Sequence, residues 1–192
     1  MSNTSLNKAL RWPNEIHSDL AHIEKFTADL NDAVAAGDED LAGFYREVLT
    51  DLSHAHERAV QACEHVLTHG LGCTLKHASL EQWATFLPDA SNPGQLRFQL
   101  YDENGFSSHA THSCLGKAAY DAASSGYCIP DDLAPERVFA LPSFVDGNQI
   151  NAVIQRANAG HLRFDEANDQ IDAIRSHRNP AQGVPAAPPA MA

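Results

Sequence analysis

Long apolar runs are missing from this 192-residue chain. No stretch approaches the ~20 consecutive apolar residues that cross a bilayer, and residues 1–15 have no apolar core behind a basic start. We therefore expect no membrane contact, no secretory leader and a cytoplasmic location. The four cysteines lack the dense spacing of a disulfide framework, so we expect free thiols in a reducing compartment.

Lysine and arginine are also scarce. The chain has 13 basic and 25 acidic side chains, and residues 1–70 alone hold 12 acidic and 5 basic ones. Affinity for a nucleic-acid backbone comes mainly from Lys and Arg, so we expect no direct binding of DNA or RNA. A net charge of −12 suits a basic protein partner; the alternative is that acidity only keeps the chain in solution.

Phosphate-binding signatures are absent as well. The chain has neither a glycine-rich Walker-type loop nor a dinucleotide fingerprint. Its paired carboxylates, such as Asp131-Asp132 and Asp165-Glu166, fall at expected turns or helix starts, which is typical of caps rather than acid-base pairs. The sequence therefore predicts no catalytic residue and no cofactor.

Regular apolar spacing is the clearest positive signal. Stripe residues recur in alternating steps of four and three in two segments separated by Gly37 and Asp38. This pattern predicts two amphipathic helices packed as a long antiparallel hairpin. The stripes are Ile16, Leu20, Ile23, Thr27, Leu30 and Val34, then Leu41, Tyr45, Val48, Leu52, Ala55, Ala59, Ala62 and Val66. Because the second helix is longer, we expect its end, residues 63–69, to dock elsewhere.

A β-hairpin followed by a short alanine-rich helix is predicted over residues 96–127. Apolar residues alternate from Leu96 to Leu100, residues 102–105 favour a turn, and the helix should run from near Ser113 to Gly126. A third strand is expected near 71–75, followed by a helix near 79–87 that a Ser79/Gln82 capping box would open. After Tyr127 the chain should be helical, with helices at 135–141, 148–158 and 165–174.

These elements predict an α+β fold that is mainly α. We expect a flexible N-terminus at 1–12, a helical arm at 13–70, a small α+β domain at 71–177 and a disordered tail at 178–192.

Two surfaces are predicted to bind a partner. On the hairpin, a three-residue turn ending at Gly105 would turn His112 inward and leave Arg97, Tyr101 and His109 on an outer face, for a protein partner or a second copy of this chain. On the arm, acidic residues fall on positions away from the helix-helix seam and form a candidate mimic of a nucleic-acid backbone. They are Asp29, Asp32, Glu47, Glu57 and Glu64.

Metal or thiol chemistry is the alternative. His109, His112, Cys114 and Cys128 are residue types that bind zinc, but His109 and His112 should point to opposite faces of a strand. A second set, Cys63, His65, His69 and Cys73, includes two histidines on one helix face. Cys114 in the first turn of a helix near His112 would suit a nucleophile, without a marked oxyanion hole. We expect no metal, and keep a zinc or cysteine-dependent enzyme centred on 109–114 as the second hypothesis.

The stretch GFSSHATHSCLGKAAYDAASSGY, residues 105–127, resembles a motif of accessory proteins carried on proteobacterial plasmids and integrative conjugative elements. There, a GF-x-x-H-x-T-H hairpin precedes an alanine-rich helix and a GY pair. The resemblance implies a dispensable accessory function such as interference with host defence, and it brings no catalytic residues. The leading hypothesis is a non-enzymatic, acidic binding protein that engages or inhibits a host nucleic-acid-binding complex, for example as an anti-CRISPR protein.

Overall fold

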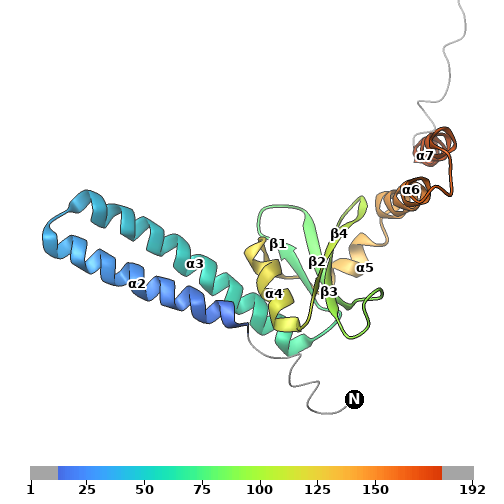
Figure 1. Cartoon of the computed structure of the whole chain (residues 1–192). Coiled ribbons are helices and arrows are strands. Elements are labelled where there is room, and N and C mark those ends of the chain that lie inside the picture. The colour runs from blue at the N-terminus through green and yellow to red at the C-terminus, as the bar shows by residue number, and fades with distance from the viewer. Residues whose placement is uncertain (1–12, 179–192) are drawn as a thin grey trace, which may run out of the picture. The chain divides into compact units, whose positions relative to one another are not determined.

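A computed structural model describes residues 13–178 of the chain (Figure 1). The predictions for residues 1–12 and for the tail beyond residue 178 lie outside the described residues. The described chain forms two compact units, one of residues 13–102 with 107–136 and the other of residues 103–106 with 137–178. Two long helices, a five-stranded sheet and further helices make up the fold, so the predicted α+β class, mainly α, is confirmed.

The helical arm of the first unit has the predicted form. Helix α2 covers Asn14–Ala36 and helix α3 covers Glu39–His69, and they pack side by side (Figure 1). Gly37 ends α2 with a φ of 71°, in the left-handed region that glycine adopts without strain. Asp38 then caps α3 by accepting the backbone N–H of Leu41 at 3.0 Å. The bend between the helices therefore follows from two adjacent residues.

The sheet has the order β4-β3-β2-β1-β5. Its strands are β1 (Thr74–His77), β2 (Gln82–Pro88), β3 (Leu96–Asp102), β4 (Gly105–His112) and β5 (Tyr127–Pro130). Strand β2 pairs antiparallel with both β1 and β3, and β5 pairs antiparallel with β1. The predicted hairpin is thus present, within a larger sheet. The strand predicted near 71–75 lies at Thr74–His77 instead, and it pairs with β2 and β5 rather than with the hairpin.

Two predicted helical segments are strands instead. Residues 79–87 were expected to be helical because Ser79 and Gln82 match a capping box, yet they contain β2. Phe86 pairs with Phe98, and Trp83 pairs with Tyr101, so aromatic cross-strand pairs outweigh the local helix signal. The expectation of helix directly after Tyr127 is also wrong, because β5 completes the edge of the sheet beside β1.

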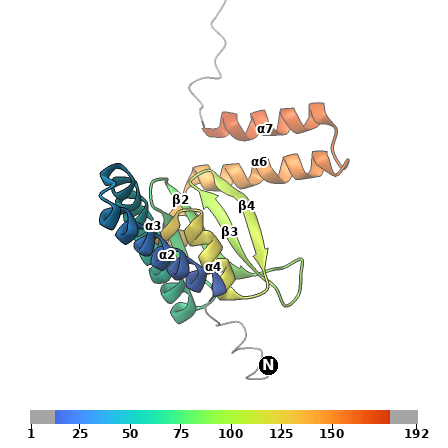
Figure 2. The same ribbon diagram turned by 60° about the vertical axis from the view of Figure 1, so that its left-hand side comes forward.

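Helix α4 (Leu115–Ser124) packs on the sheet, with the C-terminal part of α3 beside it (Figure 2). Ala118, Ala119 and Ala122 are fully buried there, and the small side chains let the helix approach its neighbours closely. Cys63 and Val66 of α3 belong to the same core, which confirms that the end of the longer helix docks on the sheet domain.

The second unit contains the turn 103–106 and two helices, α6 (Pro142–Asn158) and α7 (Phe164–Arg178). A short helix, α5 (Ala134–Val138), precedes them and spans the boundary between the units. The turn is fixed to α6 by two side chains that bind the backbone of Phe106: its N–H donates to Asn148 Oδ1 at 3.0 Å, and its carbonyl accepts from Asn151 Nδ2 at 2.8 Å. The boundary between the two units near residue 136 therefore lies within residues 71–177, which the sequence predicts to be one domain.

A close approach of backbone to backbone explains one glycine in this unit. A Cβ atom at Gly147 would lie 1.5 Å from the carbonyl oxygen of Asn104. We therefore predict that Gly147→Ala displaces the turn and loses both hydrogen bonds at Phe106, at a cost of about 1–3 kcal/mol in the free energy of unfolding. Urea denaturation followed by circular dichroism measures this cost.

The matched control is Gly43→Ala, at a helical position with nothing within 4 Å of the new methyl group. It should stabilise the chain by about 0.5–1 kcal/mol, because alanine loses less backbone entropy than glycine in a helix. Equal stabilisation by both substitutions would contradict the close approach at Gly147.

Candidate functional site

The predicted outer face of the hairpin is largely covered. Tyr101 is only 1% exposed, and its ring stacks on that of Trp83 with the centroids 5.8 Å apart. Gln99 on the same face is buried as well, and Arg97 is half-buried. The prediction that Tyr101 is exposed for a partner is therefore wrong, because Trp83 of the neighbouring strand β2 stacks on its ring. Only His109 of the three predicted residues is exposed.

The histidines and cysteine of residues 109–114 do not meet. His112 faces α4, where its Nδ1 lies 3.4 Å from a carboxylate oxygen of Asp121, and its ring stacks on Phe98. Cys114 occupies the N-cap position of α4 without making a capping hydrogen bond. The geometry pairs His112 with a carboxylate rather than with the thiol of Cys114, so it offers no support for a nucleophile at this junction.

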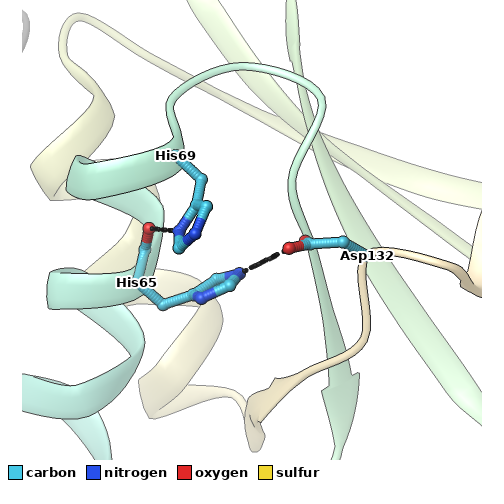
Figure 3. Close-up of side chains that lie close together, drawn as sticks. All are labelled: His65, His69 and Asp132. Carbon is cyan, nitrogen blue, oxygen red and sulfur yellow. Dashed lines mark hydrogen bonds and ion pairs between the residues drawn. The ribbon is translucent and has the colours of Figure 1, made fainter.

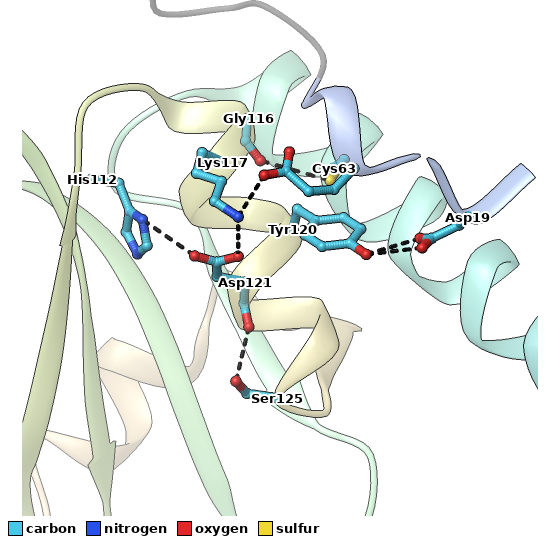
Figure 4. A network of polar contacts seen from close by, with 9 residues as sticks. Asp19, Cys63, His112, Gly116, Lys117, Tyr120, Asp121 and Ser125 are labelled. Carbon is cyan, nitrogen blue, oxygen red and sulfur yellow. Dashed lines mark hydrogen bonds and ion pairs between the residues drawn. The ribbon is translucent and has the colours of Figure 1, made fainter. Parts of the chain in front are cut away.

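Asp121 belongs to a polar network that joins α4 to the first turns of α2 (Figure 4). The Lys117 ammonium donates to Asp121 at 2.9 Å and pairs with Glu15 of α2 at 2.7 Å. One turn further along α4, the Tyr120 hydroxyl donates to both carboxylate oxygens of Asp19. Hydrogen bonding to Asp121 and Glu15 raises the pKa of Lys117. This network has a structural role, since it fixes the start of the arm to the sheet domain.

The cysteines of the second predicted metal set do not join its histidines. Both are buried in the core, where burial raises the pKa of the Cys63 thiol to about 12, and burial together with the nearby Asp132 charge raises that of Cys73 to about 12. The group of ligand atoms around His65 and His69 contains neither cysteine. The two histidines of that set, His65 and His69, do come together, but with a different third residue.

That third residue is Asp132, which follows β5 (Figure 3). His65 Nε2 lies 3.2 Å and 3.1 Å from its two carboxylate oxygens, and the rings of His65 and His69 are 4.2 Å apart. Burial raises the pKa of Asp132, but the Thr74 N–H and His65 outweigh it, so the pKa lies below its ordinary value. The sequence pattern indicated His65 and His69 as possible ligands but not Asp132, which lies 67 residues after His65. Local spacing does not predict that β5 pairs with β1, and this pairing brings Asp132 to the histidines.

A groove of 520 Å³ lies in the first unit among the arm, β1 and α4. Several of its polar groups are hydrogen-bonded, whereas the buried Nδ1 of His56 has no hydrogen-bond partner among the described residues. Tyr120 donates to Asp19, and His77 Nδ1 accepts the backbone N–H groups of Ser79 and Leu80. Ser79 Oγ also lies 3.4 Å from His77 Nδ1, but this nitrogen already accepts two backbone N–H groups, which leaves it poorly placed to act as a base.

The acidic residues predicted on the arm surface are mostly exposed. Asp32, Glu47, Glu57 and Glu64 are exposed and pair with no other residue that the structure describes. Asp29 differs, because it is half-buried and accepts a hydrogen bond from Lys25 at 2.6 Å. Four of the five residues thus contribute charge that the fold itself does not use.

Aromatic and aliphatic side chains are exposed at the end of the arm that carries the bend. Phe44 is 56% exposed, and its ring contacts Tyr45, which in turn contacts Phe26. Val34 and Leu41, on either side of the bend, are also exposed. We call Val34, Leu41, Phe44 and Tyr45 the arm tip. The arm tip was not predicted from the sequence. The available signal was Phe44, an aromatic residue that lies outside the four-three stripe and is therefore expected to face solvent.

The buried His112 generates a test by pH. Burial lowers its pKa below the ordinary value of 6.5, although Asp121 raises it; Lys117 also lowers it. A depressed pKa means that the folded state disfavours the imidazolium, so this contribution to stability is complete above about pH 6.5 and is lost as the pH falls. When the pH is lowered from about 7 to about 5, we predict that the free energy of unfolding falls less in His112→Gln than in the parent chain. Urea denaturation at each pH measures this difference.

The control for this comparison is His109→Gln, an exposed histidine on the same strand. It should keep the pH dependence of the parent, which has ten further histidines. An unchanged pH dependence in His112→Gln would contradict the assignment to His112.

No family model, curated protein or solved structure matches this chain. The resemblance of residues 105–127 to mobile-element accessory proteins therefore stays a prediction. No described helix is long and apolar enough to span a membrane. The exposed surfaces of the first unit, chiefly the acidic arm and its tip, are the features that bear on its function.

Proposed function

We propose that this chain is a non-enzymatic binding protein whose helical arm docks in a positively charged groove of a nucleic-acid-binding protein. The observation that carries the proposal is the combination, on one arm, of unpaired acidic side chains and an exposed aromatic tip. Asp32, Glu47, Glu57 and Glu64 pair with no described residue, and Phe44 lies outside the stripe that packs the two helices together.

Charge selects the class of partner. Residues 1–70 hold 12 acidic and 5 basic side chains, and Asp32, Glu47, Glu57 and Glu64 are left without partners among the described residues. Exposed charges of one sign raise the association rate with an oppositely charged surface and fix its orientation. A groove that normally binds a phosphate backbone offers such a surface, which makes the arm a candidate mimic of nucleic acid.

The arm tip supplies the apolar part of the interface. Tyrosine and phenylalanine are enriched in the cores of protein interfaces, where large rings fill pockets that are surrounded by polar contacts. Phe44 is the most exposed member of the tip, and Asp38, Glu39 and Asp40 lie exposed beside it. An aromatic anchor within an acidic rim fits a basic groove that contains an apolar pocket.

The biological setting that we propose is a mobile genetic element. A small acidic protein that occupies the nucleic-acid groove of a host defence complex would act as an inhibitor by competition, and the resemblance of residues 105–127 supports this class. His109 and Arg97 of the hairpin are assigned no role in this docking, because Tyr101, the third residue of the predicted outer face, is buried.

A charge-reversal variant tests the arm. We predict that Asp32→Lys with Glu47→Lys and Glu57→Lys weakens binding to the partner by about tenfold or more at low salt, with an unchanged melting temperature. The measurement is competition with labelled DNA or RNA for purified effector complexes of nucleic-acid-targeting bacterial defence systems. Binding of the parent chain should also weaken as salt is added.

The matched control reverses three exposed acidic residues that do not belong to the arm: Glu136→Lys with Asp169→Lys and Asp172→Lys. Both variants change the net charge by the same amount. Equal losses of binding would show that net charge alone matters, and this would contradict a specific role for the arm.

The tip is tested separately by Phe44→Ala. Removing an aromatic anchor from an interface typically costs about 2 kcal/mol or more, which corresponds to a roughly 30-fold weaker complex. Because Phe44 is 56% exposed, its loss should change the melting temperature little. Leu133→Ala, which removes a 62% exposed side chain away from the arm, should leave binding unchanged.

A further inference from the structure

We propose that His65, His69 and Asp132 form a binding site for a divalent transition-metal ion, with zinc as the best match to the ligands. One ligand atom from each residue lies within 4.8 Å of the other two. The proposal is independent of the arm surface, and it assigns a role to side chains that the proposed function does not use.

The ligands come from two segments that the fold brings together. His65 and His69 are four residues apart on α3 and therefore project from the same face of the helix. Asp132 follows β5, which pairs with β1 at the edge of the sheet. Figure 3 shows the carboxylate pointing at the His65 ring, with the His69 ring above it. A mixed set of two imidazoles and one carboxylate is a common zinc donor set.

The spacing suits coordination after small adjustments. Tetrahedral zinc with bonds of about 2.0–2.1 Å holds its ligand atoms roughly 3.3 Å apart. His65 Nε2 is already 3.1 Å and 3.2 Å from the two oxygens of Asp132. Coordination would replace the hydrogen between this nitrogen and the carboxylate by the ion, since zinc binds the neutral imidazole. A ligand nitrogen of His69 lies within 4.8 Å of these atoms.

The surrounding hydrogen bonds prepare two of the ligands. His69 Nδ1 lies 2.9 Å from the carbonyl oxygen of His65, so it carries the hydrogen and leaves the lone pair on Nε2. Asp132 Oδ1 accepts the backbone N–H of Thr74 at 2.8 Å, which orients the carboxylate. Hydrogen bonds of this kind commonly fix the tautomer of a metal-binding histidine and the direction of a metal-binding carboxylate.

The site is open on one side. The side chain of His65 is 14% exposed and that of Asp132 is 41% exposed. Three protein ligands leave at least one position for water or for a group from outside the chain. A simple ion pair between His65 and Asp132 would explain only part of this arrangement, because it requires neither His69 nor the hydrogen on its Nδ1.

The experiment is zinc titration of the full chain, without an affinity tag and after removal of bound metal, by isothermal titration calorimetry. We expect one equivalent bound by the parent. His69→Ala and Asp132→Asn should each weaken zinc binding by about 10- to 100-fold or more. This range is typical for loss of an outer-shell partner, and loss of a direct ligand should cost at least as much. Titration with Co²⁺, whose visible absorption reports the coordination geometry, should show the same order.

His54→Ala is the control, because it removes an exposed histidine from the same helix outside the cluster. Zinc should raise the melting temperature of the parent and of His54→Ala but not that of His69→Ala. His69 is exposed, so its loss leaves the fold intact even if Asp132→Asn, which loses the charge beside His65, unfolds. Absence of stoichiometric binding in the parent, or unchanged affinity in His69→Ala, would overturn the proposal.

Discussion

The packing of α4 and the end of α3 side by side on the sheet is the constraint on which the first unit depends. Ala118, Ala119 and Ala122 are fully buried in this layer, and only small side chains allow a helix backbone to approach two neighbours at once. Larger residues would force the elements apart, since cores tolerate added volume poorly. The polar bridges from Lys117 and Tyr120 to α2 then secure the start of the arm at the same place.

This anchoring has consequences at both ends of α3. The C-terminal end is held in the core through Cys63 and Val66, which brings His65 and His69 to the edge of the sheet where Asp132 follows β5. The N-terminal end packs against α2, and the residues near the bend keep exposed surface. One helix thus provides a candidate metal site where it is buried and a candidate docking surface where it is not.

The two proposals can succeed or fail separately. Helix α3 has 31 residues and therefore spans about 45 Å, which places the arm tip and the histidine cluster far apart. Substitutions at sites this distant, with no shared partners, usually act additively. Loss of zinc binding should leave the acidic surface as it is, and reversal of the arm charges should leave the histidine cluster unchanged. A combined variant would show whether the metal contributes to docking.

The sequence by itself determined the arm, because helix periodicity, a left-handed glycine and an aspartate cap are local signals over residues 16–66. It also determined the hairpin of β3 and β4 and the alanine-rich helix after it. Only the tertiary structure decided that residues 82–88 form a strand, since their pairing with β1 and β3 outweighs a local capping signal, and that Tyr101 is buried. The contact between His65 and Asp132 also depends on the tertiary structure, because sheet pairing brings together two positions that are 67 residues apart and that no local pattern connects.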